Sequence, residues 1–292
     1  MRKQLGKIKK AFIDHGKNKY LAYQEIFPRF FKNRNMVSRI YSFSAVKQQF
    51  KKSDTIFILG NGPSLNLPKE KDIQEIAKHD VFGVSLSFLK KDIKPTFHQL
   101  ALEADKTWRD PVVQAFAPYR SQYRDVIFFF SDKVLLRLGH PRLTPEFFPE
   151  NPKCCLYPQP EAISLETNRP FQDLDFNQKI FYRGTLSLIL SLAVKMGYKK
   201  IVLLGVDLNT RKHFYDDYPE MTDYCRRLYA FYESLGVTEK YESMLPKRDK
   251  LHPFDVYLYA LNDYLIRKKS CEIFTGFKTS ILYPKLKAYF PD

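Results

Sequence analysis

The chain has 292 residues, of which 44% are hydrophobic, so it is long and apolar enough to bury a substantial core. Its 48 lysines and arginines oppose 32 acidic residues, and the resulting net charge of +16 favours an anionic partner. Nucleic acid, an acidic membrane surface and an anionic sugar or nucleotide all fit that charge. The sequence shows no apolar run of about 18 residues and no signal-peptide core, which predicts a soluble or peripheral protein.

The basic excess is densest in residues 1–52, where only Asp14 and Glu25 oppose the lysines and arginines. One interpretation is a solvated helical extension that packs some of its aromatic residues on the main domain. The other is a cationic amphipathic segment that lies on an anionic membrane surface. No nucleic-acid-binding motif is present, so no nucleic-acid partner is expected. We expect an N-terminal extension over residues 1–52 and a single domain over residues 53–292.

The cysteines show neither a CxxC pair nor the spacing of zinc ligands. They are Cys154, Cys155, Cys225 and Cys271. Neighbouring residues such as Cys154 and Cys155 are poor disulfide partners for each other. The pattern therefore predicts reduced thiols in a cytoplasmic setting.

The stretch over 55–65 organises the rest of the chain. Its apolar run over 56–59 predicts a short buried strand of a parallel sheet. The turn Gly60-Asn61-Gly62 then lets backbone amides approach a ligand closely, and Ser64 is a candidate helix N-cap or phosphate donor. A strand that runs into such a turn is where α/β proteins bind phosphate. The turn matches neither the dinucleotide fingerprint nor the P-loop, so an ordinary strand-to-loop turn is the alternative.

Strands and helices alternate along the rest of the chain, which predicts an α/β fold with a Rossmann-like, mostly parallel sheet flanked by helices. Asp207 ends a predicted strand over 199–207, at the same sheet edge as the glycine turn. A loop over 209–218, expected to be mobile, and a helical segment over 219–247 form a lid-like insertion over about 208–250. The other expected elements are a helix over 69–78, strands over 80–85, 95–100 and 125–130, an irregular insertion over 139–176, a buried helix over 185–196, a helix after Pro253 and a strand over 271–274.

Glu103 and Asp105 follow the strand predicted over 95–100, where open parallel sheets place their ligands. Carboxylates at that position fit either a metal site or a surface turn. No paired acidic motif of the DxD kind is present, so no metal cofactor is expected. Four scattered histidines without ligand spacing are interpreted as structural or surface residues, namely His79, His98, His140 and His213.

Three separated stretches carry a family resemblance. The first is Gly60-Asn61-Gly62-Pro63-Ser64-Leu65, and the second runs from Arg183-Gly184-Thr185-Leu186-Ser187 to Asp207. The third is His252 ahead of a late helix, followed by Ser280 before the final apolar segment. In order and spacing these stretches resemble bacterial sialyltransferases of glycosyltransferase family 42, across residues 53–292. The glycine motif also occurs in proteins similar to archaeal pterin diphosphokinases and flagellin nonulosonate transferases.

The resemblance implies a metal-independent GT-A variant that binds a CMP-activated sialic acid and inverts its anomeric carbon. It implies that His252 is the catalytic base. Arg183 is the second catalytic candidate, and a donor contact, a pair with Asp207 and support of His252 remain open for it. The residues expected to bind the donor and its nucleotide are Gly60, Asn61, Gly62, Ser64, Ser85, Gln99, Thr185, Ser187, Asp207, Asn209, Tyr215 and Tyr218. The family has a phosphate-binding tyrosine in place of Asn209, and strand-end asparagines in place of Ser85 and Gln99.

The leading hypothesis is an inverting glycosyltransferase that moves sialic acid, Kdo or a related nonulosonate from a CMP-sugar to a bacterial surface glycan. It would act in the cytoplasm, peripheral to the inner membrane. Histidine suits deprotonation of the acceptor hydroxyl, and the glycine-turn amides with the Tyr215 hydroxyl suit the leaving phosphate. The alternatives are a pterin diphosphokinase-like phosphoryl transferase, which needs Mg²⁺ and ATP, and a noncatalytic nucleotide-binding accessory protein. The sequence leaves open the acceptor, the linkage and whether the chain forms a homo-oligomer.

Overall fold

The computed structural model describes residues 39–99, 106–131, 153–157, 182, 184–234 and 253–290. The chain divides into two compact units, residues 1–50 with 102–159 and residues 51–101 with 160–292. This differs from the expected extension over 1–52 followed by one domain. The reason is that strand β1 (Arg39–Tyr41) pairs in parallel with β6 (Lys153–Tyr157), so β1 folds with a distant part of the chain. None of the helices in the described ranges is long and apolar enough to cross a membrane.

Within the unit formed by residues 51–101 and 160–292, five parallel strands are ordered β4-β3-β2-β7-β8. Their bounds are Phe97–Gln99 for β4, Asp80–Val84 for β3, Thr55–Leu59 for β2, Lys200–Leu204 for β7 and Glu272–Thr275 for β8. The chain adds β3 and β4 on one side of β2, and then returns to add β7 and β8 on its other side. Such a reversal is the switch point of a doubly wound sheet, and ligands bind at the carboxyl ends of the two strands that flank it. The predicted parallel α/β fold is confirmed, and the switch point lies between β2 and β7.

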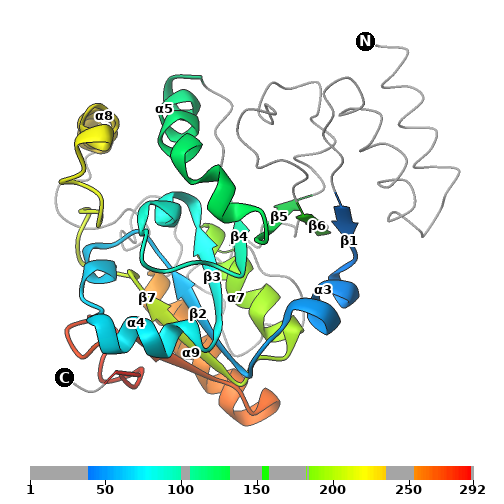
Figure 1. Ribbon diagram of the computed structural model, residues 1–292. Coiled ribbons are helices and arrows are strands. Elements are labelled where there is room, and N and C mark those ends of the chain that lie inside the picture. The colour runs from blue at the N-terminus through cyan, green and yellow to red at the C-terminus, as the bar shows by residue number, and fades with distance from the viewer. Residues whose placement is uncertain are drawn as a thin grey trace, which may run out of the picture. The chain divides into compact units, whose positions relative to one another are not determined.

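Three long helices cover this sheet. Helix α4 (Glu70–Ala77) lies on one face, whereas α7 (Thr185–Met196) and α9 (Phe254–Lys269) lie on the other (Figure 1). Right-handed crossovers produce this division when the direction of strand addition reverses. Helix α7 has the predicted bounds and ends at Gly197, whose φ of 78° is the left-handed conformation that glycine adopts without strain.

The central strand β2 is buried along its whole length, with residues 56–59 at 0% exposure. An apolar run without alternation is typical of a parallel strand that is covered on both faces. The Phe57 ring contacts Tyr289 edge-on at 5.1 Å and stacks on Phe290 at 5.9 Å between centroids. The C-terminal segment thus closes one face of the core over β2.

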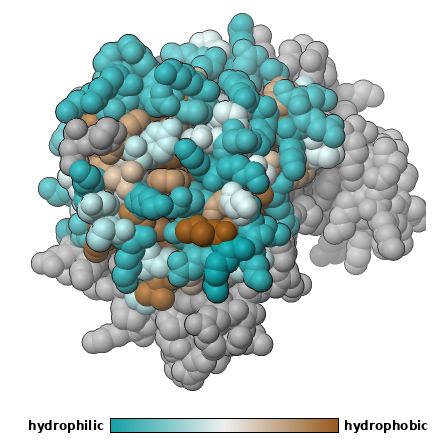
Figure 2. Space-filling model, turned by 90° about the horizontal axis from the view of Figure 1, so that it is seen from below, coloured by the Kyte–Doolittle hydropathy of each residue, from teal (hydrophilic) through white to brown (hydrophobic). Residues whose placement is uncertain are grey.

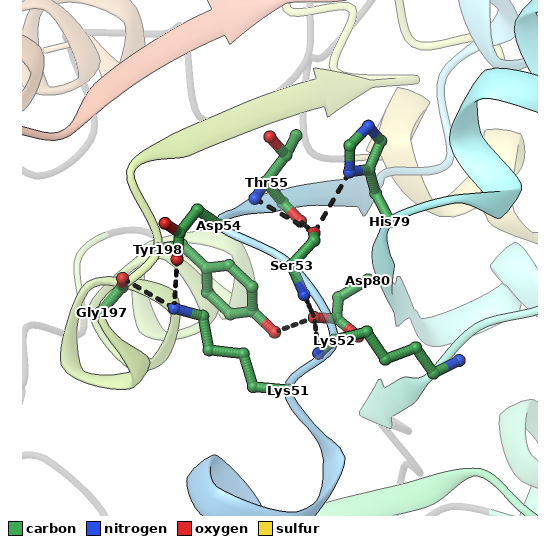
Figure 3. Close-up of polar contacts among 9 residues, drawn as sticks. All are labelled: Lys51, Lys52, Ser53, Asp54, Thr55, His79, Asp80, Gly197 and Tyr198. Carbon is green, nitrogen blue, oxygen red and sulfur yellow. Dashed lines mark hydrogen bonds and ion pairs between the residues drawn. The ribbon is translucent and has the colours of Figure 1, made fainter.

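The amino end of β2 is held by a buried carboxylate (Figure 3). Asp80 Oδ2 accepts hydrogen bonds from the backbone N–H groups of Lys52 at 2.8 Å and Ser53 at 3.3 Å, and from the Tyr198 hydroxyl at 2.9 Å. Lys51 Nζ donates to Asp54 at 2.8 Å and to the Gly197 carbonyl at 3.0 Å. These contacts tie the entry of β2 to the starts of β3 and β7, and so fix the register that aligns their carboxyl ends.

The unit formed by residues 1–50 and 102–159 contains a parallel arrangement of β1, β6 and β5 (Ile127–Ser131), with helices α3 (Phe43–Phe50) and α5 (Lys106–Phe116) and the 3-10 helix η4 (Ala117–Tyr123). The prediction of an irregular insertion over 139–176 is wrong at β6. Cys154 and Cys155 are 1% and 0% exposed and act as small apolar residues of a strand. Prolines on both sides of this short run gave it the composition of a loop.

The remaining described elements are short 3-10 helices at Pro63–Asn66 (η2), Ser85–Leu89 (η3) and Pro219–Met221 (η6), and helix α8 (Thr222–Ser234). The strands predicted over 80–85, 95–100 and 271–274 are confirmed, with shifts at their ends. Hydrophilic side chains predominate among the described residues on the face seen in Figure 2, as expected for a chain with 27% charged residues.

Candidate functional site

A cavity of about 320 Å³ opens at the carboxyl ends of β2 and β7, at the switch point of the sheet. It is lined by the segments 60–62, 84–85, 184–186 and 205–208, and by Thr210, Lys212, His213 and Phe254. Its volume is within the range of small-molecule sites. The cavity therefore collects segments that are far apart in the sequence, including parts of the first two stretches on which the family resemblance rests.

The glycine turn packs directly against the loop that follows β7. The Gly60 N–H donates to the Leu204 carbonyl and the Gly62 N–H to the Gly205 carbonyl, each at 2.7 Å. A Cβ on Gly60 would lie 2.3 Å from the Gly205 carbonyl oxygen, which is too close for two non-bonded atoms. The structure therefore corrects one prediction, because these amides are used to join two loops and do not point at a ligand phosphate.

Asp207 and Ser64 lie together at this edge, as the sequence predicted for Asp207. The Ser64 N–H donates to Asp207 Oδ2 at 2.6 Å, so the carboxylate holds the start of η2. Ser64 is not a helix N-cap, because the 3-10 helix begins one residue earlier at Pro63 with Gly62 as its cap. Ser64 also lies outside the lining of the cavity, whereas Asp207 is part of it.

The Asn61 side chain supplies a buried acceptor at the cavity. Its Oδ1 is buried and has no hydrogen-bond partner within the described ranges, and its backbone carbonyl accepts from the Phe214 N–H at 3.0 Å. An unsatisfied buried polar atom costs about 1–3 kcal/mol, so such atoms are rare outside functional sites. Asn61 is therefore suited to accept a hydrogen bond from an amine or hydroxyl of a ligand.

Ser85 lines the cavity in a strained conformation, with a φ of 51°. Its carbonyl lies 3.0 Å from Nε2 of His98, a fully buried side chain on β4. Burial lowers the pKa of His98 to about 4, so the ring is neutral and holds the Ser85 backbone as a donor. Gln99 is half-buried beside Val84 in the β4–β3 register and lies outside the lining.

The start of helix α7 faces the cavity through Gly184, Thr185 and Leu186. Free N–H groups and the helix dipole make such an end favourable for an anion. Of the two hydroxyls predicted near this helix start, only one lies at the cavity. Thr185 lines the cavity, whereas Ser187 is fully buried, accepts from the Tyr182 N–H at 2.7 Å and donates to the Gly184 carbonyl at 2.9 Å.

The expected lid segment is described over 208–234, and part of it is packed instead of mobile. Tyr215 is 2% exposed and its ring stacks on His213, with 5.0 Å between centroids. Tyr218 meets the Phe214 ring edge-on at 5.9 Å. Asn209 is exposed. None of Asn209, Tyr215 and Tyr218 belongs to the lining, so their predicted contact with phosphate stays a prediction without support from the geometry.

This loop brings a histidine to the cavity that was not predicted as a site residue. His213 lines the cavity at 7% exposure, and Lys212 and Thr210 line it beside His213. The backbone N–H of His213 donates to Asp216 Oδ2 at 3.1 Å, and the His213 ring faces Asp216 and Tyr229. The only sequence signal was an aspartate three residues after a histidine in a loop, and this pattern is too common to identify a functional residue.

Several predicted residues lie outside the described ranges, namely Arg183, His252, Glu103, Asp105 and His140. Phe254 follows His252 by two residues and lines the cavity. The Tyr182 ring, next to Arg183 in sequence, stacks on Tyr257 of α9 with 4.9 Å between centroids. No group of three or more metal-ligating side chains gathers within the ranges described, and metal independence stays a prediction.

No protein-family model matches this chain, and no curated protein matches it. Among solved structures, the monofunctional α-2,3-sialyltransferase Cst-I from Campylobacter jejuni is similar over 81% of this chain and 80% of its own, at 18% identity and a TM-score of 0.43. The sialyltransferase CstII from Campylobacter jejuni, solved with the substrate analogue CMP-3FNeuAc, is similar over 80% of this chain and 86% of its own, at 16% identity and a TM-score of 0.43. The MAf glycosyltransferase from Magnetospirillum magneticum is similar over 64% of this chain and 28% of its own, at 19% identity and a TM-score of 0.35. These values describe a distant similarity of fold.

Proposed function

We propose that this chain is an inverting glycosyltransferase that moves an acidic sugar from a CMP-sugar donor to a hydroxyl of a bacterial surface glycan. The acidic sugar is sialic acid, Kdo or a related nonulosonate. One observation carries the proposal: residues from two of the stretches that resemble sialyltransferases line one cavity at the switch point. Gly60 and Gly62 belong to the first stretch and Thr185 and Asp207 to the second, and Phe254 of the helix that follows Pro253 lines the same cavity.

The electrostatics of the cavity suit a nucleotide phosphate. The amino end of helix α7, the Thr185 hydroxyl, Lys212 and His213 all line it, and each of these groups attracts an anion. The carboxylate of Asp207 is committed to the Ser64 N–H at 2.6 Å. Asn61 Oδ1 offers an acceptor for a donor group on the base or the sugar.

The chemistry requires that the acceptor hydroxyl loses its proton as its oxygen bonds to the anomeric carbon, while the bond from that carbon to the phosphate oxygen breaks. We assign the proton to His252, which the chain places directly before Pro253 and α9. Arg183 directly precedes Gly184 at the start of α7, and we assign it to the donor. Because CMP leaves as a phosphate monoester that these donors stabilise, the proposed reaction needs no metal.

A thermal-shift panel of nucleotides and a donor-hydrolysis assay in EDTA test this function. Stabilisation by CMP or CDP, but not by ADP or UDP, supports the donor class through binding linkage. His252→Gln should lower turnover about 10²- to 10⁴-fold, whereas His79→Gln, at the opposite end of β3, should not. Strict dependence on Mg²⁺ and ATP would establish the phosphoryl transferase instead, and a chain that binds CMP without turning over any CMP-sugar would be an accessory protein.

We also propose that residues 1–52 contact an anionic membrane surface, because they hold the densest basic charge of the chain. Residues 39–50 include β1 and α3, so a deletion that tests this idea should remove only residues 1–38. Co-sedimentation with phosphatidylglycerol vesicles should be lost in that variant. Equal sedimentation of the full-length and shortened chains would contradict the proposal.

A further inference from the structure

His213 differs from the other described histidines because it lines the cavity and has a fixed orientation. His79 bonds to Ser53 and Glu75 at the amino end of the sheet, and His98 bonds to the Ser85 backbone. His213 is 7% exposed, and its ring stacks on Tyr215 with an interplanar angle of 18°. Its position is therefore set by packing before any ligand binds, as electrostatic stabilisation of a ligand requires.

Asp216 and Tyr229 fix the proton on the His213 ring. The Tyr229 hydroxyl makes a short hydrogen bond to Asp216 Oδ2, and Tyr229 Oη lies 3.3 Å from His213 Nδ1. Since the tyrosine proton goes to the carboxylate, the tyrosine oxygen accepts from Nδ1–H, and the ring can donate from Nε2 as well only in its imidazolium form. Asp216 Oδ1 is 3.7 Å from Nδ1, close enough to stabilise the imidazolium form.

Asp216 is ionised in this arrangement. Burial raises the pKa of its carboxyl, but hydrogen bonds from His213 and Tyr229 outweigh burial and hold that pKa below its usual value. Burial, followed by the charge of Asp216, raises the pKa of the nearby Cys225 thiol to about 12, so this thiol stays neutral. Burial, and then the hydrogen bond to Asp216, also raises the pKa of Tyr229, which therefore remains a proton donor.

We propose that His213, positioned by Asp216 and Tyr229, is the residue that binds the phosphate of the nucleotide, as an imidazolium that donates a hydrogen bond to it. This inference rests on the proposed function for the identity of the ligand. It replaces the phosphate contact that the sequence assigned to Asn209, Tyr215 and the glycine-turn amides. No proton is transferred in this role: the electron pair of the breaking bond goes to the phosphate oxygen, and the imidazolium stabilises that charge.

The other charged or titratable groups that lie around this cluster or line the same cavity are Lys212, Asp207, Asp216, Tyr229, Cys225, Arg211 over the Tyr229 ring at 5.2 Å, and Glu233 paired with Arg211 at 3.3 Å.

Isothermal titration of the full-length protein with CMP and with cytidine at pH 6 tests the inference. CMP should bind more tightly than cytidine, because only CMP carries the phosphate. His213→Gln should weaken CMP about 10- to 100-fold and leave cytidine within about twofold. Asp216→Asn should also weaken CMP and leave cytidine within about twofold, whereas loss of a purely structural support would weaken both. His79→Gln is the matched control and should match the wild type.

Three results would overturn the inference. One is a His213→Gln protein with unchanged CMP affinity, and another is equal weakening of CMP and cytidine. The third is an Asp216→Asn protein whose affinity for CMP equals that of the wild type. If the wild type binds UMP or AMP in place of CMP, the proposed cytidine-based donor is wrong. The His213→Gln protein is then compared with the wild type using the nucleotide that binds. If no nucleoside monophosphate binds, both proposals fail.

Discussion

The carboxylate of Asp207 accepts a hydrogen bond from the backbone N–H of Ser64 at 2.6 Å, across 143 positions of sequence. This bond joins the loop after β2 to the loop after β7, the two strands that flank the switch point. A charge-assisted bond to a backbone amide is among the stronger hydrogen bonds in proteins. The Asp207 carboxylate thus adds a side-chain bond to the two backbone bonds, from Gly60 to Leu204 and from Gly62 to Gly205, that join the same loops.

Replacing that carboxylate should weaken the contact between the two loops but leave the cavity in place. Asp207→Asn keeps the volume of the side chain but loses the charge, so we expect the free energy of unfolding to fall by about 1–2 kcal/mol. CMP affinity should fall as well, because residues 60–62 lose their support. Urea denaturation and titration with CMP measure the two effects, with the exposed Asp92→Asn as the control. An Asp207→Asn protein as stable as that control would show that the bond contributes little.

Gly60 should be irreplaceable for a reason of packing. A Cβ there would lie 2.3 Å from the Gly205 carbonyl oxygen, a backbone atom that also accepts the Gly62 N–H. Gly60→Ala should therefore cost at least about 2 kcal/mol of stability and abolish nucleotide binding. Gly184→Ala is an informative comparison, because a Cβ at Gly184 meets no atom within 4 Å and only the φ of 144° is unfavourable. A Gly60→Ala protein that binds CMP normally would contradict the packing of the two loops.

Periodicity and apolar runs were sufficient to predict the parallel α/β class and most of the described strands. The run over 56–59 gave β2, and the small apolar residues over 185–196 gave α7 with the bounds that the structure has. β6 was not predicted, because Cys154 and Cys155 were considered as disulfide or zinc-binding candidates and not as apolar residues of a strand. Local sequence also carries no information on which strand pairs with β1, because that pairing joins residues more than a hundred positions apart.

The site was predicted less completely, for reasons that individual residues make clear. Asp207, Gly60, Gly62, Asn61, Thr185 and Ser85 were expected at the cavity and line it. Ser187 was expected there because the family resemblance implies a serine or threonine near this point, but its hydroxyl closes the turn before α7. His213 was missed because its partners Asp216 and Tyr229 come from a loop and a helix whose approach no spacing rule encodes.

Tyr198→Phe should separate stability from function. The Tyr198 hydroxyl donates to the buried Asp80 at 2.9 Å, at the amino end of the sheet and away from the cavity. Removing it leaves one donor fewer on a buried carboxylate, which should lower the free energy of unfolding by about 1–3 kcal/mol. CMP affinity should be unchanged. Thermal unfolding and titration with CMP measure the two quantities, and loss of affinity in a still-folded Tyr198→Phe protein would show that the two ends of the sheet are coupled.

His98 should make stability depend on pH in a defined window. Burial lowers the pKa of His98 from 6.5 to about 4, so the unfolded chain binds a proton more readily than the folded one below pH 6.5. Its contribution is fully present above pH 6.5 and is lost as the pH falls through about 4. A shift of that size corresponds to about 3 kcal/mol.

Carboxylates also titrate in this window, so the measurement is the difference in stability between wild type and His98→Gln, which keeps a donor near the Ser85 carbonyl but does not titrate. Urea denaturation at pH 7 and pH 4.5 should show that difference shrinking toward pH 4.5. A difference that is the same at both pH values would mean that the folded protein accommodates the protonated ring, and that Ser85 is held by another contact.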